Sequence, residues 1–179
     1  MIGFLSGKAS RSTVFVHPLA EETVMDINMG LTADQRAAMA DAVGRLLADT
    51  YALYFKTHAY HWNVTGPRFH DLHAMFEEQY TELWQATDEI AERVRALGEL
   101  APISYDELAK KASIKFDAET PDAETMVKNL VAGHEQVVRT ARAVLKLAGE
   151  HGDEATADLV APRLSIHEKT AWMLRATAG

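Results

Sequence analysis

The chain has 179 residues, 47% of them hydrophobic, no cysteine, and a formal net charge of −8 at pH 7. This length and composition allow one globular domain to bury its own core. Without cysteine there are no disulfides, iron–sulfur clusters or thiolate zinc sites, so any metal must take nitrogen and oxygen ligands. The acidic balance argues against a broad nucleic-acid surface, because phosphate contacts come from lysine and arginine.

The first 25 residues are expected to form a flexible tail, and residues 26–179 the single domain. Lys8 and Arg11 are the candidate DNA contacts, since many such tails in one assembly would touch DNA through weak contacts. The alternative is an ordinary frayed terminus. The tail lacks the pattern of a signal peptide, which is a basic start followed by about seven apolar residues. The sequence also contains no run of about 18 apolar residues, the length of a transmembrane helix. We therefore expect a cytoplasmic protein without a membrane span.

Helical signals follow the tail. Thr32, with Gln35 three residues on, matches a capping box, and the helix that it opens is predicted to run to about Val64. A second helix is predicted from near residue 69 to a glycine at residue 98, which suits a helix end.

A connection of more than 20 residues comes next, and residues 105–112 within it are able to form a short helix. A third long helix is predicted from just after Pro121 to about Gly149, and a fourth from about Asp153 to Arg175. Four long helices with one long crossover between the second and third make an all-α, ferritin-like four-helix bundle.

Five side chains in the first half of the chain form a candidate metal-ligand set: His61, His73, Glu77, Asp88 and Glu92. Imidazole and carboxylate groups suit a redox-active divalent metal such as iron. Four of the five lie in the second predicted helix, where about 100° per residue places them along one face, with Glu92 at its edge. Yet Glu77 and Asp88 are eleven residues apart, roughly 16 Å at about 1.5 Å per residue. One metal cannot bridge that distance within one chain.

The spacing therefore predicts a site shared by two chains. An antiparallel copy of the second helix would bring the histidine end of the set in one chain to the Asp88 end in the other, and a two-fold dimer would hold two such sites. A second stripe on the same helix is predicted to face the core: Leu72, Phe76, Leu83, Ile90, Val94 and Leu97. Taken singly, Asp88 and Glu92 beside Arg93 and Arg95 would also fit a salt-bridged helix face. The joint register of five ligands favours the metal site.

Several segments carry a resemblance to a known family. They read His61-Trp62-Asn63-Val64-x-Gly66, Leu72-His73-x-x-x-Glu77, Asp88-Glu89-Ile90-Ala91-Glu92-Arg93, and His167-Glu168-Lys169-x-x-Trp172-Met173-Leu174-Arg175. Over roughly residues 30–175 the chain thus resembles the Dps family, the miniferritins of starved bacterial cells. The resemblance implies a hollow homododecamer that oxidises Fe(II), preferably with hydrogen peroxide, at two-fold interfaces. It also implies storage of ferric mineral in the cavity, which protects DNA from oxidative damage.

The resemblance also divides the iron ligands between two subunits. It assigns His61, His73 and Glu77 to one subunit, and Asp88 and Glu92 to its partner. The family often has Asp where this chain has Glu77, and the extra methylene changes the reach of that carboxylate. Trp62 would lie beside the centre, where an aromatic side chain can quench a stray oxidising equivalent. The alternative for Trp62 is an interface packing residue.

Acidic residues at the start of the last helix, Asp153, Glu154 and Asp158, resemble the lining of the family's three-fold pores and would draw Fe(II) inward. The other interpretation is an N-terminal helix cap with favourable dipole charges, and both can be true. Two other functions were weighed: a nucleoid DNA-binding protein with iron handling secondary, and a structural assembly with a vestigial site. The acidic body argues against the first and the intact ligand set against the second, so an iron-oxidising storage enzyme is the prediction.

The remaining histidines are assigned no metal. His58 and His70 are interpreted as interface or supporting groups near the site. His167 is expected to pack or hydrogen-bond within the last helix. Three others are expected at the surface: His17, His134 and His151.

Overall fold

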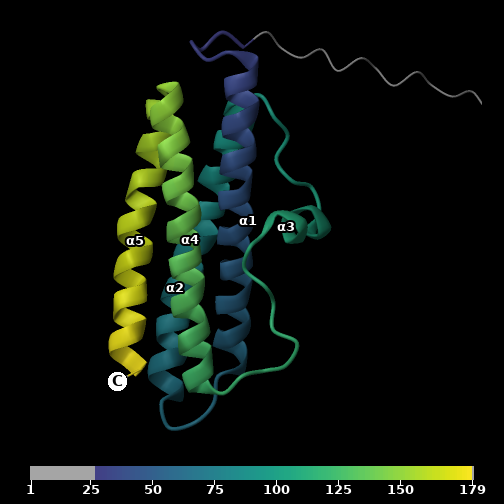
Figure 1. Ribbon diagram of the computed structural model, residues 1–179. Helices are drawn as coiled ribbons and strands as arrows, with labels where there is room; N and C mark the ends of the chain where they lie inside the picture. Colours follow the sequence, from purple (N-terminus) through teal and green to yellow (C-terminus); the bar gives the residue numbers. More distant parts are fainter. Residues whose placement is uncertain (1–26, 179) are drawn as a thin grey trace, which may run out of the picture.

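The computed structural model describes residues 27–178, which form five helices. They are α1 (Ala33–Asn63), α2 (Phe69–Ala96), α3 (Tyr105–Lys111), α4 (Ala123–His151) and α5 (Glu154–Ala178). Figure 1 shows the four long helices side by side as a bundle, with α3 standing outside α1 in the crossover. The predicted all-α bundle with a short helix in its crossover is confirmed. No helix of residues 27–178 is long and apolar enough to span a membrane, and the tail with Lys8 and Arg11 lies outside this range.

Capping groups fix the ends of the long helices. The Thr32 hydroxyl accepts a hydrogen bond from the backbone N–H of Gln35 at 3.2 Å, and the Gln35 side chain accepts one from the Thr32 N–H at 2.9 Å. The predicted capping box is therefore confirmed. At the end of α4, Gly152 has a φ of +67° and caps the helix in the left-handed region that glycine favours. The predicted end at Gly149 is two residues too early for this reason.

The core lies along the inner stripe of α2 and its neighbours. The six α2 residues predicted to face inward are each at most 3% exposed: Leu72, Phe76, Leu83, Ile90, Val94 and Leu97. They pack into one cluster with apolar residues of α1 and α4. The most extensive packing between helices is that of α1 with α2 and of α4 with α5. Because burial of this stripe sets the rotation of α2, its ligand-bearing face must point away from the core.

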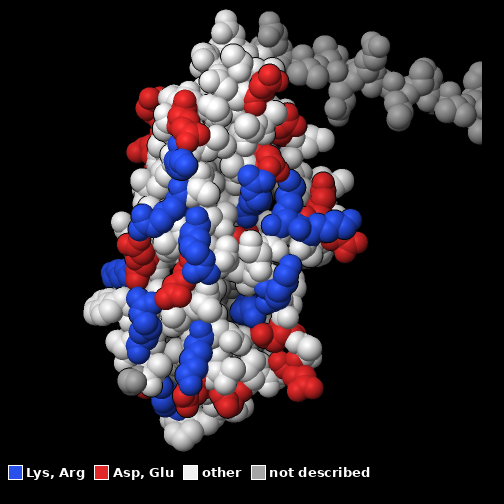
Figure 2. Space-filling model, viewed as in Figure 1, with Lys and Arg blue, Asp and Glu red and all other residues white. Residues whose placement is uncertain are grey.

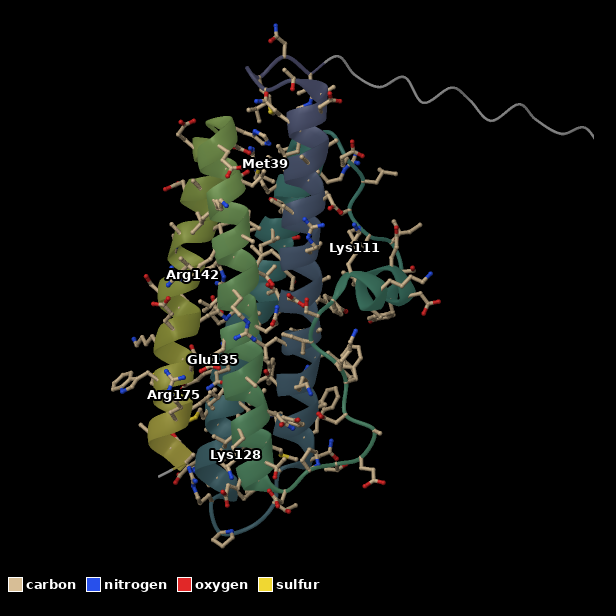
Figure 3. The ribbon with its side chains drawn as sticks, viewed as in Figure 1. Met39, Lys111, Lys128, Glu135, Arg142 and Arg175 are labelled. Carbon is tan, nitrogen blue, oxygen red and sulfur yellow. The ribbon has the colours of Figure 1, made fainter. Side chains whose placement is uncertain are left out.

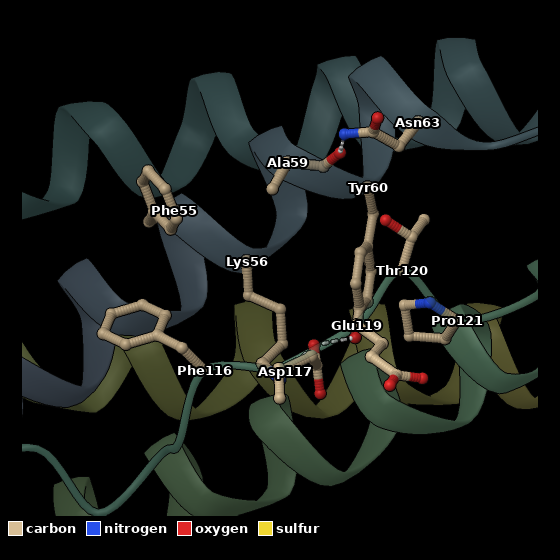
Figure 4. A pocket seen from close by; sticks show the side chains of 11 residues that line it. Phe55, Lys56, Ala59, Tyr60, Asn63, Phe116, Asp117, Glu119, Thr120 and Pro121 are labelled. Atoms are coloured by element: carbon tan, nitrogen blue, oxygen red, sulfur yellow. Dashed lines mark hydrogen bonds and ion pairs between the residues drawn. The ribbon is translucent and has the colours of Figure 1, made fainter.

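A buried polar contact holds the crossover against α1 (Figure 4). The Asp117 carboxylate accepts hydrogen bonds from Lys56 Nζ at 2.8 Å and from the Tyr60 hydroxyl at 2.5 Å. Lys56 and Tyr60 are 7% and 4% exposed. Burial, with the hydrogen bond to Asp117, raises the pKa of Tyr60. Beside this contact, Phe55 packs edge-on against Phe116. These contacts hold the crossover against the side of α1.

Two histidines meet inside the bundle. His134 of α4 and His167 of α5 are 2% and 0% exposed, and their Nδ1 atoms lie 2.9 Å apart. The expectation for His167 is confirmed, whereas the surface position predicted for His134 is wrong. His134 falls four residues after Leu130 and three before Val137, so it belongs to the inward stripe of α4. Burial lowers the pKa of His134 to about 3 and that of His167 well below its usual range.

Charged side chains of opposite sign alternate over the outer face of α4 and α5 (Figure 2). Ion pairs join the two helices there, between Arg142 and Glu168 at 2.6 Å and between Arg175 and Glu135 at 2.8 Å (Figure 3). All four side chains are about half exposed or more, so each pair contributes at most about 1 kcal/mol. This face is not a continuous basic surface of the kind that binds nucleic acid.

Two glycines of α4 differ sharply in surroundings and give a matched test of core packing. A Cβ atom at Gly133 would lie 2.6 Å from Cδ1 of the buried Leu53, whereas nothing lies within 4 Å of one at Gly149. We expect Gly133→Ala to lower the free energy of unfolding by about 1–3 kcal/mol through overpacking. Gly149→Ala should raise it by up to about 1 kcal/mol through helix propensity. Urea denaturation at fixed protein concentration measures both, and a shift of the same sign in both variants would contradict the packing.

The buried histidine pair predicts an acid-sensitive fold. Both histidines have lowered pKa values in the folded chain, so below the ordinary value of 6.5 the unfolded chain takes up protons that the folded chain does not. The free energy of unfolding should therefore be highest above pH 6.5. It should fall toward pH 5 by up to about 1.4 kcal/mol per pH unit for each such proton. Urea denaturation of metal-free protein at pH 7.5, 6.5 and 5.5 measures the slope. His134→Leu should reduce it, and an unchanged slope in that variant would contradict the assignment.

Candidate metal centre

Two imidazoles form the base of the candidate centre. His61 lies in the last turn of α1 and His73 near the start of α2, and their rings stack with centroids 3.7 Å apart and planes 19° from parallel. His61 Nδ1 lies 2.8 Å from the carbonyl oxygen of His73, and His73 Nδ1 lies 2.8 Å from that of His61. Because a carbonyl oxygen only accepts, each Nδ1 carries the proton. Both Nε2 lone pairs are therefore free for a metal, with the ring orientations fixed by the backbone.

The turn at residues 64–68 makes this pairing possible. Val64 is 1% exposed, and its N–H donates to the carbonyl of Tyr60 at 2.8 Å, which closes α1. Gly66 then takes a φ of +105°, a conformation that residues with a Cβ rarely adopt. Phe69, the first residue of α2, stacks on His73 with ring centroids 5.0 Å apart. The short turn thus folds α2 back so that the two histidines face one another.

The three carboxylates of the predicted set are solvent-exposed: Glu77, Asp88 and Glu92. None of them forms an ion pair with any residue of the range 27–178. Arg93, which offered the alternative of a salt-bridged face, instead donates to Asp153 at 2.6 Å. The carboxylates therefore retain their full capacity to bind a cation.

One chain does not complete the centre. Within the part of the chain that the structure describes, no group of three or more histidine, aspartate and glutamate side chains is placed to hold a metal ion. His61 and His73 are together, and Glu77 follows His73 by one turn of α2. Asp88 lies a further roughly 16 Å along the same helix. The predicted ligands thus lie in two separate groups. Such a separation is expected if a second chain supplies the missing ligands.

An aromatic cluster flanks the histidine pair. His58 stacks on Tyr80 with centroids 3.9 Å apart, lies 4.1 Å from the ring of Trp62, and has its Nδ1 3.2 Å from the Tyr54 hydroxyl. Trp62 and the neighbouring Trp84 are 59% and 56% exposed. The i, i+4 spacing of Tyr54, His58 and Trp62 on α1 indicates part of this cluster in the sequence, whereas the approach of Tyr80 from α2 has no local signal. His70, by contrast, points into solvent.

A groove opens beside Asp88. It has a volume of about 690 Å³ and runs between α1, α2 and the crossover. Trp84 and Tyr51 line it together with Pro102 and Leu108. Large apolar side chains exposed together mark a contact surface for another macromolecule. The groove and the exposed tryptophans therefore lie on the ligand-bearing side of α2.

The acidic residues predicted to line a pore have different surroundings. Asp153 is 4% exposed and accepts hydrogen bonds from Arg93 and from both the N–H and the hydroxyl of Thr156. Burial alone would raise the pKa of Asp153, but these hydrogen bonds lower it overall. The helix-cap interpretation of Asp153 is thus confirmed. Glu154 and Asp158 are exposed to solvent, and a role for them in a pore stays a prediction.

Comparison with known proteins agrees with the bundle. The model of the ferritin-like domain family matches residues 40–179. A low temperature-induced protein of Nostoc sp. is 43% identical over 151 residues, covering 83% of this chain and 84% of that protein. The DNA protection during starvation protein of Porphyromonas gingivalis is 36% identical over 149 residues, covering 83% and 94%.

Among solved structures, the Dps protein of Vibrio cholerae superposes with a TM-score of 0.82 at 38% identity, covering 87% of this chain and 98% of that one. That structure is described as a member of a broad superfamily of ferritin-like diiron-carboxylate proteins. The chain is therefore a ferritin-like protein, and the predicted fold class is confirmed. Within that class it belongs to the Dps family.

The free Nε2 atoms give a direct test by metal binding. We expect His61→Ala to weaken the binding of Co²⁺, used as a non-oxidising substitute for Fe²⁺, at least about tenfold, or about 1.4 kcal/mol. His70→Ala is the matched control, because His70 is exposed and takes no part in the pair. Calorimetric titration of the assembled protein measures both affinities. Equal affinity in the His61 variant and the wild type would remove His61 from the ligand set.

Proposed function

We propose that this protein oxidises Fe(II) and stores the ferric product. The observation that carries the proposal is the reciprocal pairing of His61 and His73, in which each Nδ1 donates to a backbone carbonyl and each Nε2 is left available as a metal ligand. Glu77 follows His73 by one turn of α2 and would supply a carboxylate from the same chain. Imidazole with carboxylate is a donor set that iron accepts. Names of relatives such as the DNA protection during starvation proteins are consistent with a protective role.

A second copy of the chain is proposed to complete each centre. Placed antiparallel on α2, the partner would bring its Asp88 and Glu92 to the histidines of the first chain, and the two-fold axis would generate a second centre. The same contact would cover the groove beside Asp88 and the exposed tryptophans. We further propose that such dimers assemble into a hollow dodecamer, as the family resemblance implies.

The ligand types determine the chemistry at this centre. Carboxylate oxygens stabilise Fe(III) over Fe(II), and open positions admit an oxidant. Hydrogen peroxide is the proposed oxidant: its O–O bond breaks as it accepts one electron from each of two Fe(II) ions, and two hydroxides form. Because both electrons arrive together, hydroxyl radical is avoided. Trp62, next to His58, either quenches any stray oxidising equivalent or packs the interface. Glu154 and Asp158 are proposed to attract Fe(II) toward the storage cavity.

The decisive experiment compares two neighbouring carboxylates. Metal-free protein is loaded anaerobically with Fe(II) and mixed with peroxide or oxygen in a stopped-flow instrument while ferric absorbance is followed. We expect fast oxidation by peroxide in the wild type and in Glu89→Gln, and a loss of at least about tenfold in Asp88→Asn, because only Asp88 lies on the ligand face. Oxidation no faster than in buffer for the wild type would overturn the proposal.

Mixed assemblies then test whether the centre is shared. His73→Ala and Asp88→Ala each remove one end of the ligand set, and each is expected to be inactive alone. When the two variants are unfolded together and reassembled, some dimers should regain one intact centre of their two. Recovered peroxide-dependent oxidation supports a shared centre, whereas no recovery in correctly assembled mixtures places all ligands within one chain.

DNA binding is the second candidate function, favoured by the names of the relatives. The face of α4 and α5 in Figure 2 carries charges of both signs, and the candidate DNA contacts are Lys8 and Arg11 of the tail, which lie outside the described residues. If the tail binds DNA, retardation of a DNA duplex in a gel should weaken steeply with salt and disappear when both residues are replaced by alanine. Retardation unchanged by these substitutions would exclude the tail as the contact.

A further inference from the structure

A chain of buried hydrogen bonds crosses the bundle from α2 to α4. The guanidinium of Arg163 on α5 is ion-paired through both its terminal nitrogens with the carboxylate of Glu82 on α2. Its Nη2 also lies 3.1 Å from Nε2 of His167, whose Nδ1 lies 2.9 Å from Nδ1 of His134. Arg163 is 6% exposed, and both histidines are at most 2% exposed. Four side chains from three helices are thus linked in sequence, from the partly exposed Glu82 to the buried histidines.

The donors in this chain can be assigned from one end to the other. Arginine only donates, so His167 must accept at Nε2 and carry its proton on Nδ1. That Nδ1–H then donates to Nδ1 of His134, which must therefore carry its own proton on Nε2. Burial keeps both rings neutral by lowering their pKa values. The Arg163 guanidinium thus fixes the tautomers of both histidines. The result is an N–H donor at Nε2, on the far edge of the His134 ring.

This donor has no partner among the residues that the structure describes. His134 Nε2 is buried and makes no hydrogen bond within residues 27–178, and the same holds for Oε1 of Gln79 on α2. Both residues line one cavity of about 290 Å³ between α2, α4 and α5. Buried polar atoms are almost always paired with protein or with ordered solvent. Two residues that line the same cavity therefore each carry one unpaired buried atom, a donor on His134 and an acceptor on Gln79.

We propose that this cavity binds a small neutral molecule that both donates and accepts hydrogen bonds, the chemical class of water and hydrogen peroxide. It accepts from His134 Nε2–H and donates to Gln79 Oε1. A metal ion does not fit, because the proton on His134 Nε2 occupies the lone pair that a metal needs. An anion does not fit either, because it cannot donate to Gln79 and would face the carboxylates of Glu78 and Glu82 in the same wall, where Lys169 is the one cation.

The size of the cavity agrees with this class. A water molecule fills about 30 Å³ in the liquid, so the space is ample for one ordered molecule in contact with both atoms and for further solvent beside it. Glu82, where the chain of hydrogen bonds begins, also lines the cavity. The bound molecule therefore connects His134, the last residue in the chain of hydrogen bonds, to α2 close to Glu82. In this way it links α4 to α2 directly.

Neutron and X-ray diffraction from metal-free crystals test the site. We expect a proton on His134 Nε2, none on its Nδ1, and an ordered oxygen within hydrogen-bond distance of both His134 Nε2 and Gln79 Oε1. In Gln79→Leu that oxygen should lose its occupancy, whereas Glu78→Gln, altering the exposed neighbour in the same wall, should retain it. A crystal soaked in hydrogen peroxide distinguishes the sources: one-atom density means water alone, and elongated two-atom density means that peroxide replaces it.

Three results would overturn the proposal: a proton on His134 Nδ1, a cation in the cavity, or a direct bond between His134 and Gln79 with no bound molecule. The wild-type neutron structure decides among them even if Gln79→Leu fails to fold. Because the crystals contain no metal, the outcome is independent of iron oxidation.

Discussion

The rotation of α2 about its own axis is the constraint on which the rest of the structure depends. Six apolar residues on one stripe are buried within the chain, and the ligand-bearing stripe lies roughly 120° around the helix, so it cannot also face the core. Within residues 27–178, carboxylates without ion-pair partners, tryptophans more than half exposed and a candidate metal centre that lacks ligands all agree with this geometry. A second copy of the chain is proposed to complete the centre.

Local patterns made most of the fold predictable. The capping box at Thr32 and the inward stripe of α2 depend on residues within a turn or two of one another, and both agree with the structure. Contacts between distant residues were not predictable in this way. Asp117 meets Lys56 across 61 positions of sequence, and His134 meets His167 across 33, so no periodicity within one element indicates either contact.

The candidate centre shows the same division. The candidate ligands and their separation into two groups follow from residue type and helical spacing, and their role as ligands stays a prediction. The protonation of the two histidines did not, because it depends on where the turn at 64–68 places two backbone carbonyl oxygens. The aromatic cluster around His58 likewise needs the packing of α1 on α2, since Tyr80 approaches it from the other helix.

The reciprocal bonds between His61 and His73 also constrain how this protein can vary. Surface turns usually tolerate inserted residues, because lengthening them costs little free energy. Here each ring is tied to the backbone on the opposite side of the turn, so one added residue would displace both carbonyl acceptors together. The length of the connection between α1 and α2 therefore sets the geometry of the candidate metal centre as much as the two histidines do.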